Sequence, residues 1–339
     1  MKVNYIYLDI TNKCNMNCLY CCKKNGQEFV RDIDMALLHR VLCWGKTHNA
    51  NAITLSGGEP ALHRDFDFIL HAVKNKKYDN LRVMTNGHLF SLDLDAATIE
   101  LIDEVCFSID SNVEDNNLAT RKGFNESIFR EIDGFHKKHP KIVLTIKSTI
   151  TTYNKDDLNS LVNFAIRYGF SKVTFGFCLP LGKGANMDTY NKIRGTASEL
   201  FKIQERIIRI KRRYSSLIEI VEPCVVFGCK LINGVDELDI HVDENGFIYP
   251  CDGMNDSRFI VGNIKDNDLE TCIFNNLENI KTIINTNNEK CKLCTIAESC
   301  EGSCLLYGNP VSEYGADMFC DFRRLKITKD NLMRLISNV

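Results

Sequence analysis

The twenty residues from Val3 to Cys22 read VNYIYLDITNKCNMNCLYCC, and this stretch decides the fold. Its first eight residues, VNYIYLDI, alternate apolar and polar side chains, which predicts a β-strand. Four cysteines then fall within nine residues, at Cys14, Cys18, Cys21 and Cys22. The stretch therefore predicts a strand that leads into a loop crowded with thiols.

This strand is the first of six that alternate with helical patterns as far as Cys178. Such alternation indicates βαβ units of the α/β class and a parallel sheet, with active residues at the carboxyl ends of its strands. The strands are predicted at VNYIYLDI, AITLS, LRVMTN, EVCFSID, IVLTIKSTI and KVTFGFC, and helices near residues 35–48, 66–76, 93–102, 127–138, 156–168 and 196–214.

The composition is that of a globular protein, with 339 residues, 44% hydrophobic and 25% charged residues and a net charge of -2. This length fits one barrel-type domain and a small second one. The near-neutral charge gives no general attraction to nucleic acid or anionic membranes, and no apolar run reaches the roughly 20 residues of a membrane span. The N-terminus also lacks the apolar core of a signal peptide. We therefore expect a cytoplasmic protein without nucleic-acid or membrane partners.

The sixteen cysteines of the chain would stay reduced in the cytoplasm, which favours metal binding or catalysis over disulfides. Cys14, Cys18 and Cys21 have the spacing Cys-x3-Cys-x2-Cys. Thiolates bind iron-sulfur clusters or zinc, and a structural site normally has four protein ligands. Cys22 is a poor fourth ligand because adjacent residues rarely turn both side chains to one cluster. The open position indicates a site that admits a substrate or cofactor.

The cysteine motif resembles the signature of the radical S-adenosylmethionine (radical SAM) superfamily, in which an aromatic residue, here Tyr20, precedes the last cysteine. SGGEP at Ser56–Pro60 directly follows the second predicted strand and resembles the family's Gly-Gly-Glu-Pro motif. The resemblance implies a 4Fe-4S cluster held by Cys14, Cys18 and Cys21, whose fourth iron is chelated by SAM. One-electron reduction then yields methionine and a 5′-deoxyadenosyl radical, which abstracts a hydrogen atom from the substrate.

The resemblance also implies which residues bind SAM. Glu59 offers an acceptor to the SAM amino group, the glycines beside it allow close backbone approach, and Tyr20 is expected near the adenine. Polar residues at strand ends fit SAM contacts and backbone caps equally well. The expected SAM-binding residues are Tyr20, Gly57, Gly58, Glu59, Pro60, Asn86, Ser108 and Lys147.

Asp110 and Cys178 are the candidate catalytic residues, because they end the fourth and sixth predicted strands. Cys178 would donate a hydrogen atom to a substrate radical, as in some radical epimerases. Simple packing is the favoured alternative, since free cysteine is among the most buried residue types. The following LPLGKG resembles a Pro-x-Gly-Arg/Lys-Gly loop in one branch of the family.

Beyond Pro223 the chain holds nine of its sixteen cysteines and a hairpin signal at HVDENGFIYP, with Asn245-Gly246 at the turn. A zinc ribbon would use only four of these thiolates, whereas eight thiolates would fill two sites of four cysteines each. The pattern resembles the SPASM domain of radical SAM maturases, which binds two auxiliary 4Fe-4S clusters. By analogy the first cluster would take Cys224, Cys229, Cys251 and Cys304, and the second Cys291, Cys294, Cys300 and Cys320.

The resemblance implies a partial (β/α)6 parallel barrel over residues 1–215 and a small cysteine-rich iron-sulfur SPASM domain over 216–339. The expected activity is hydrogen abstraction from a ribosomally made peptide, ending in a crosslink or an epimerisation. Thirteen residues before Cys14 leave no room for a winged-helix leader-binding domain, so a separate leader-recognition protein or the barrel would bind the leader. The electron donor would be of flavodoxin or ferredoxin type.

Two other substrate classes and two non-enzyme roles are the alternatives at this point. The substrate could be a Cys or Ser of a sulfatase-type protein, or a sugar or aminoglycoside. An iron-sulfur electron carrier or a zinc-stabilised scaffold would be no enzyme at all, but neither explains a three-ligand site coupled to SGGEP.

Overall fold

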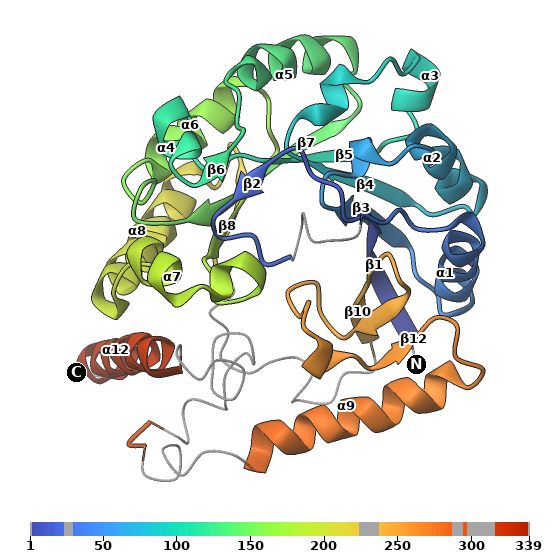
Figure 1. Ribbon diagram of the computed structural model, residues 1–339. Coiled ribbons are helices and arrows are strands. Elements are labelled where there is room, and N and C mark those ends of the chain that lie inside the picture. The colour runs from blue at the N-terminus through green and yellow to red at the C-terminus, as the bar shows by residue number, and fades with distance from the viewer. Residues whose placement is uncertain (1, 24–29, 224–236, 287–293, 297–315, 338–339) are drawn as a thin grey trace.

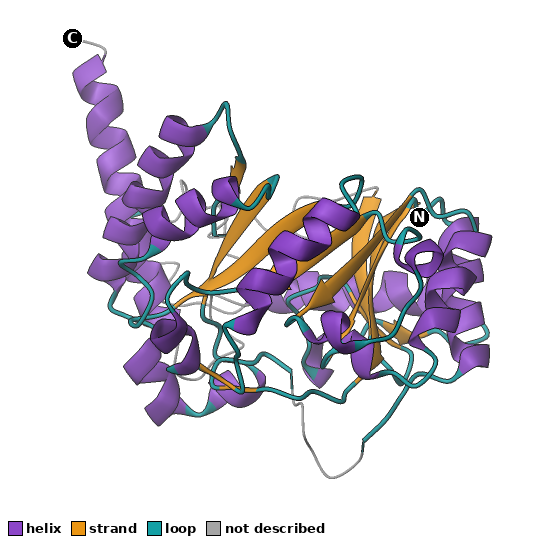
Figure 2. Cartoon of the chain, turned by 90° about the horizontal axis from the view of Figure 1, so that it is seen from above, coloured by secondary structure: helices purple, strands orange, loops and turns teal. Residues whose placement is uncertain are grey.

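The computed structural model describes residues 2–23, 30–223, 237–286, 294–296 and 316–337. Its main sheet has ten strands in the order β12-β11-β10-β1-β3-β4-β5-β7-β8-β9. Helices form an arc around the outside of this curved sheet (Figure 1), and Figure 2 shows them flanking the strands from above. The arrangement confirms the predicted α/β class with a parallel, partial-barrel sheet.

All six predicted strands are present, in the predicted order and parallel to one another. Two more parallel strands extend the sheet at its edges, β9 beside β8 and β10 beside β1. The parallel strands are β1 (Lys2–Thr11), β3 (Ala52–Gly57), β4 (Asn80–Thr85), β5 (Glu104–Ser108), β7 (Val143–Ile150), β8 (Lys172–Phe177), β9 (Glu219–Val221) and β10 (Glu237–Val242).

The predicted helices also form, and only the one expected at residues 93–102 is much shorter. It begins after Asp95, because the Asp95 carboxylate accepts a hydrogen bond from the backbone of Thr98 and so fixes the first turn there. The helices are α1 (Met35–Thr47), α2 (Phe66–Asn75), α3 (Ala96–Ile99), α4 (Glu114–Leu118), α5 (Ser127–Lys138), α6 (Leu158–Arg167), α7 (Met187–Ile193) and α8 (Ala197–Tyr214), with 3-10 turns η1 (Pro60–Leu62), η2 (His88–Ser91), η3 (Gly182–Ala185) and η4 (Ser257–Phe259).

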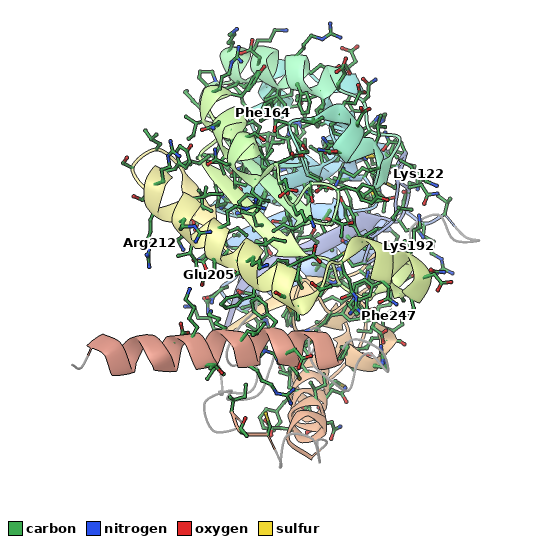
Figure 3. All side chains as sticks on the ribbon, turned by 90° about the vertical axis from the view of Figure 1, so that its left-hand side faces the viewer. Lys122, Phe164, Lys192, Glu205, Arg212 and Phe247 are labelled. Carbon is green, nitrogen blue, oxygen red and sulfur yellow. The ribbon has the colours of Figure 1, made fainter. Side chains whose placement is uncertain are left out.

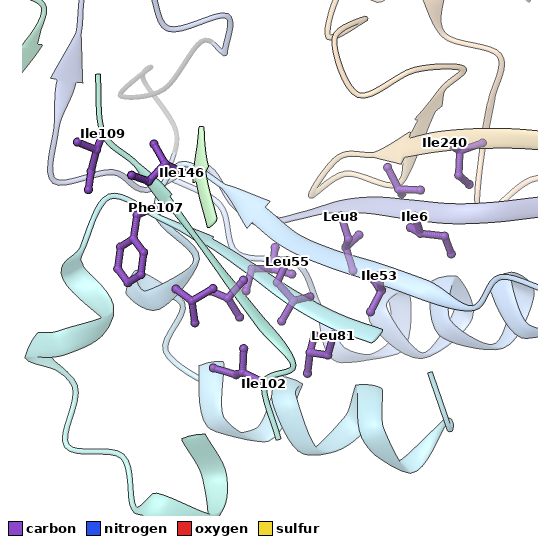
Figure 4. Packing of buried hydrophobic residues seen from close by; sticks show 14 of the residues in the cluster. Ile6, Leu8, Ile53, Leu55, Leu81, Ile102, Phe107, Ile109, Ile146 and Ile240 are labelled. Atoms are coloured by element: carbon purple, nitrogen blue, oxygen red, sulfur yellow. The ribbon is translucent and has the colours of Figure 1, made fainter. Parts of the chain in front are cut away.

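The hydrophobic core lies between the sheet and the helices around it. In β3 and β4 apolar, fully buried residues recur at every second position, as Ile53 and Leu55 of β3 and Leu81 of β4 show in Figure 4. The residues between them are polar, for example Thr54, Ser56 and Arg82. This period of two leaves the opposite face of the sheet lined with polar groups, which is the face on which the site described below is built.

Strands of the predicted second domain join the same sheet. The predicted hairpin is present, with β10 antiparallel to β11, and β10 pairs in parallel with β1 so that His241 lies beside Tyr7. The later elements are β11 (Phe247–Tyr249), β12 (Gly262–Asn263), α9 (Leu269–Thr286) and α12 (Ala316–Ser337). The division at residues 215 and 216 therefore stays a prediction, because one sheet runs across it.

Helix α12 packs against α8. The Phe322 ring lies 6.1 Å from the ring of Phe177 and 6.3 Å from that of Phe201. Lys329 forms an ion pair with Glu205, which lies on the side of α8 turned toward α12 (Figure 3). No helix among the described residues combines the length and apolar character needed to cross a membrane.

Candidate active site

The cysteine loop, residues 12–23, leaves the carboxyl end of β1 and includes the short strand β2 (Asn17–Cys18). It carries Cys14, Cys18 and Cys21, which are all partly exposed and form no disulfide with a described residue. Burial raises the pKa of all three thiols, and the Cys18 thiol raises the pKa of Cys14 and Cys21 further. Cys18 is thus close enough to Cys14 and to Cys21 to affect the ionisation of both, and Cys22 affects that of Cys21 as well.

Contacts from three other segments hold the cysteine loop in place. Strand β2 pairs with β6 (Arg121–Lys122), beside which it lies in Figure 1. The Asn86 amide donates to the Asn15 side chain at 2.7 Å. The ammonium of Lys183 in η3 donates a hydrogen bond to the Asn17 side chain, and its backbone N–H donates one to Cys21 O. The loop is therefore fixed by β4, β6 and η3 together.

The segment Gly57–Glu59 joins the cysteine loop to the end of β3. The backbone N–H groups of Gly58 and Glu59 donate to Thr11 O and Lys13 O, each at 2.7 Å. A Cβ atom at either glycine would overlap with one of these carbonyl oxygens. Glycine is therefore required here by the close approach of two backbones.

Glu59 is buried, and both of its carboxylate oxygens accept hydrogen bonds. Thr85 Oγ1 donates to one at 2.7 Å and the backbone N–H of Asn86 donates to the other at 2.7 Å. Burial raises the pKa of Glu59 to about 7, although these hydrogen bonds oppose the shift. Pro60 follows as the first residue of η1. Glu59 thus binds the ends of β3 and β4 to each other and lies close to its charge transition at neutral pH.

Tyr20, Asp110 and Arg121 form a buried group beside the cysteine loop. Tyr20 donates its hydroxyl hydrogen to Asp110, and Arg121 donates to the Tyr20 oxygen at 2.7 Å and lies 3.8 Å from Asp110. The backbone N–H of Thr149 donates to the other Asp110 oxygen at 2.8 Å. Burial raises the pKa of Asp110, against the effect of Arg121. The catalytic candidate Asp110 is only 1% exposed and is occupied by these partners.

Lys147 lies beside Ser108 in the register of β7 and β5, so two of the predicted SAM-binding residues are neighbours. The Lys147 ammonium is 3.7 Å from the Asp252 carboxylate, and these side chains are 43% and 49% exposed. Lys147 opposes the effect of burial on Asp252 and holds its pKa below the ordinary value. This pair faces accessible space, unlike Asp110.

Cys178 is 2% exposed and packs in a small apolar cluster with Tyr190 and Ile193. Leu19 and Tyr20 of the cysteine loop lie against the same cluster. Burial raises the pKa of the Cys178 thiol far above its usual range. These surroundings agree with a packing role, and the hydrogen-donor role stays a prediction.

A family model supplies the observation that identifies this part of the chain. Residues 8–165, which begin within β1 and include the cysteine loop, SGGEP and the strands as far as β7, match the model described as the radical SAM superfamily. The chain carries a radical SAM domain.

Relatives of the radical SAM domain fall into two groups. The GTP 3′,8-cyclase of Clostridium botulinum (strain Okra / Type B1) is 24% identical over 265 residues, covering 74% of this chain and 81% of that protein. Two solved proteins share the fold. AnSMEcpe with bound AdoMet is 20% identical with a TM-score of 0.72, covering 100% of this chain and 99% of that one. Streptococcus suis SuiB bound to S-adenosylmethionine is 18% identical with a TM-score of 0.67, covering 90% and 73%.

Both solved proteins have also been studied with peptides, SuiB with the precursor peptide SuiA and anSMEcpe with a peptide named Cp18Cys.

The donor groups of the radical SAM domain fit the cluster and the SAM molecule that its family implies. Three cysteines share one loop, and cysteine thiolates are the usual ligands of iron-sulfur clusters. Among the described residues no three Cys, His, Asp or Glu side chains converge on a single ion. A 4Fe-4S cluster distributes its ligands over separate iron atoms and does not require such a convergence. Because these thiols have raised pKa values, cluster binding must release their protons.

The auxiliary ligands predicted by resemblance are only partly described. Cys224, Cys229, Cys291, Cys300 and Cys304 lie outside the described residues. Cys251 follows β11 and accepts a hydrogen bond from the backbone N–H of Gly253 at 3.4 Å. Cys294 lies 4.0 Å from an Arg324 nitrogen, and Cys320 lies on α12. The two proposed groups of four cysteines therefore stay predictions.

The sequence analysis missed Arg121, Asp252 and Lys23, which the structure places at the site. Two of them had a local signal, since Asp252 follows the predicted ligand Cys251 and Lys23 ends the cysteine motif. Arg121 had no local signal in the sequence, because it is 101 residues from its partner Tyr20.

Proposed function

We propose that this protein is a radical SAM enzyme that abstracts a hydrogen atom from a peptide, most simply a ribosomally made one that it crosslinks or epimerises. The observation that supports a peptide is the similarity in fold to SuiB and anSMEcpe, which extends over 90% to 100% of this chain and includes residues beyond the radical SAM domain. The reaction outcome is part of the proposal.

When bound, the 4Fe-4S cluster and SAM supply a 5′-deoxyadenosyl radical by one-electron reduction and cleavage of SAM. The residues of this chain would hold and orient both groups. Cys14, Cys18 and Cys21 would ligate three irons, and their loop is already fixed by its contacts with β4, β6 and η3.

Glu59 would accept a hydrogen bond from the SAM amino group. Its pKa of about 7 means that the free carboxyl is only partly ionised at neutral pH. A neighbouring ammonium favours the charged form of a carboxyl group. Bound SAM would therefore lower the pKa of Glu59 and stabilise the carboxylate that holds it.

The SAM carboxylate would bind at Ser108 and Lys147, which are neighbours across β5 and β7. Arg121 would keep Tyr20 in position at the other side of the cysteine loop, because it donates to the Tyr20 hydroxyl at 2.7 Å. Lys147 and Asp252, both about half exposed, would meet the bound groups from the polar face of the sheet.

The region after residue 215 would be a SPASM domain with two auxiliary 4Fe-4S clusters that accept an electron from the substrate or anchor it. Two described features support this proposal. Cys251 follows the β10–β11 hairpin, as the domain's Gly-x4-Cys pattern requires, and Cys251 neighbours Asp252, which reaches Lys147 of the barrel. A separate leader-binding protein and a flavodoxin or ferredoxin donor belong to the same proposal.

A nucleotide substrate is the second candidate. It is favoured by the GTP 3′,8-cyclases, to which the chain is similar over 74% of its length. Both candidates share the cleavage of SAM and differ in the molecule that loses the hydrogen atom.

Deuterium transfer distinguishes these candidates. Protein reconstituted anaerobically with iron and sulfide would be reduced chemically and given SAM with either of two probes. One probe is a set of deuterated synthetic peptides that match short reading frames beside the gene, and the other is GTP deuterated in the ribose. We expect deuterium in 5′-deoxyadenosine from a peptide.

Transfer from GTP alone would overturn the peptide proposal. Absence of 5′-deoxyadenosine from iron-loaded protein would overturn the radical SAM activity itself. A Cys14→Ser variant is the matched control for cleavage that does not depend on the cluster.

A further inference from the structure

A second buried charged group lies at the far end of the cysteine loop, and the proposed chemistry does not use it. Asp9, near the end of β1, is 2% exposed. One of its carboxylate oxygens accepts a hydrogen bond from the Lys23 ammonium, and the other lies 2.8 Å from His241 Nε2. Lys23 is 9% exposed and His241 is fully buried. We call Asp9, Lys23 and His241 the Asp9 group.

Aromatic rings fix the orientation of His241 within this group. The Tyr249 ring stacks on the imidazole at 5.2 Å, and the Tyr7 ring meets it edge-on at 5.6 Å. Lys23 also lies over the Tyr7 ring, with its nitrogen 5.1 Å from the ring centre. Among the described residues, His241 Nδ1 has no hydrogen-bond partner, so the imidazole bonds through Nε2 to Asp9.

Asp9 is ionised in this environment. Burial alone would favour the neutral acid, but Lys23 and His241 lower the pKa of Asp9 to about 2. An ionised carboxylate can only accept hydrogen bonds, so Nε2 of His241 carries the hydrogen. The Asp9 group is therefore a charged, oriented arrangement of three side chains that exclude water.

The two partners of Asp9 come from distant parts of the chain. Lys23 is 14 residues from Asp9 and only two residues beyond Cys21. His241 is 232 residues from Asp9 and lies on β10, the strand that extends the barrel sheet beside β1. The contacts described above fix the cysteine loop to barrel elements, whereas this one reaches the region after residue 215.

We propose that His241 is a positioning residue for the SAM-binding cluster, which acts through Asp9 and Lys23 to fix Cys21 in the place where it binds iron. This inference rests on the proposed cluster at Cys14, Cys18 and Cys21. Without His241, Asp9 would keep Lys23 but lose its other hydrogen bond, and an unsatisfied oxygen of a buried carboxylate draws in water or displaces its neighbouring side chains. Displacement of Lys23 would move Cys21, two residues away, and a cluster site tolerates only about 0.5 Å of such movement.

The test compares His241→Leu with His241→Gln in the full-length protein. Leucine removes the donor to Asp9, whereas the glutamine amide can keep it. After anaerobic reconstitution, the electron paramagnetic resonance spectrum of the reduced protein is recorded with and without SAM. The component that changes with SAM reports only the cluster to which SAM binds. We expect a roughly tenfold loss of this component in His241→Leu, as for outer partners of metal ligands, and its recovery in His241→Gln.

Arg82→Met is the matched control. It breaks a comparable ion pair, between Arg82 and Glu104 at 2.7 Å, at the amino end of β5 and away from the cysteine loop. Thermal unfolding of each apoprotein measures the loss of stability separately. We expect Arg82→Met to lower the unfolding temperature and to keep the SAM-dependent component. Lys23→Met, which keeps the alkyl chain without its charge, replaces His241→Leu if that variant does not fold.

The possible failures are distinguishable. If the wild-type protein binds iron but shows no SAM-dependent component, the proposed function is wrong. If the wild type shows it and both His241→Leu and Lys23→Met keep it in full, the positioning role is wrong. If Arg82→Met loses the component in proportion to its stability, as His241→Leu does, the Asp9 group has only a general structural role and the inference is overturned.

Discussion

At the scale of single residues, Cys22 shares a crowded loop with three predicted ligands and differs from one of them, Cys18, in the charges around it. Burial raises the pKa of Cys22, and Lys23 and Lys147 oppose that shift. For Cys18, burial also raises the pKa, but Arg121 is the opposing charge. Burial also raises the pKa of Cys21, and Cys22 and Lys23 influence it next, so these charges do not separate Cys22 from the predicted ligands. Leaving Cys22 out of the ligand set stays a prediction.

The corresponding prediction concerns serine substitutions. Cys22→Ser should keep both the iron content and the cleavage of SAM, because its thiol is not expected to bind iron. Cys14→Ser, Cys18→Ser or Cys21→Ser should abolish cleavage, since serine is a poor ligand for iron-sulfur clusters. Iron analysis and 5′-deoxyadenosine production measure both effects. Normal cleavage in any of the last three variants, or none in Cys22→Ser, would contradict the assignment.

Glu59 gives a prediction about pH. Its pKa rises on folding from 4.5 to about 7, so the folded apoprotein binds more protons than the unfolded chain between these values. The contribution of Glu59 to stability is therefore greatest below pH 4.5 and falls as the pH rises through about 7, by at most on the order of 3 kcal/mol.

Glu59→Gln removes this titration. The free energy of unfolding of the variant minus that of wild type should therefore be larger at pH 8 than at pH 5, even if the variant is less stable than wild type at both. Denaturant unfolding of the apoprotein at the two pH values measures the change. A constant difference between the two proteins would show that Glu59 does not titrate in this range.

At the scale of elements, the turn η3 contacts the cysteine loop directly. Gly182 adopts φ 57°, and a Cβ atom there would overlap with the carbonyl oxygen of Cys22 and lie 2.7 Å from that of Cys21. The next residue, Lys183, donates its backbone N–H to Cys21 O at 2.9 Å. The resemblance at LPLGKG therefore corresponds to a contact with the predicted ligand loop.

Gly182→Ala should push η3 away from the cysteine loop and lower the iron content of the SAM-binding site. Gly134→Ala is the control, because a Cβ atom at Gly134 in α5 meets nothing within 4 Å. Alanine there should stabilise the helix by about 0.5–1 kcal/mol and leave the iron content unchanged. Equal iron loading in the two variants would show that the η3 contact is dispensable.

At the scale of the whole molecule, the number of clusters distinguishes a radical SAM domain alone from one with two auxiliary sites. Three 4Fe-4S clusters give about 12 iron atoms per chain, and the combined Cys14→Ser, Cys18→Ser and Cys21→Ser variant should keep about 8. Cys251→Ser and Cys320→Ser, which lie in different proposed groups, should each lose about 4. A wild-type content of about 4 iron atoms would contradict the SPASM proposal, and mainly zinc would contradict the mechanism.

Much of the barrel could be predicted because its signals are local. The alternation in VNYIYLDI predicts the extended strand β1 and its apolar face with Ile6, Leu8 and Ile10, and the same period recurs in the five later strands. SGGEP could be recognised because close backbone approach requires glycine at two particular positions. The early start predicted for α3 was wrong because the capping hydrogen bond of Asp95 outweighs the helical pattern before it.

The sequence by itself determined the strands, the class of the fold and the loop that carries the predicted iron ligands. These follow from the period of the apolar residues, the alternation of strands with helices and the spacing of the cysteines. Only the tertiary structure decided what fixes that loop: β10 joins the barrel beside β1, Asp9 binds both Lys23 and His241, and Arg121 reaches Tyr20. Those contacts join residues up to 232 positions apart. These pairs form because burial and charge favour them once the sheet has assembled around the side chains. No short stretch of sequence contains that information.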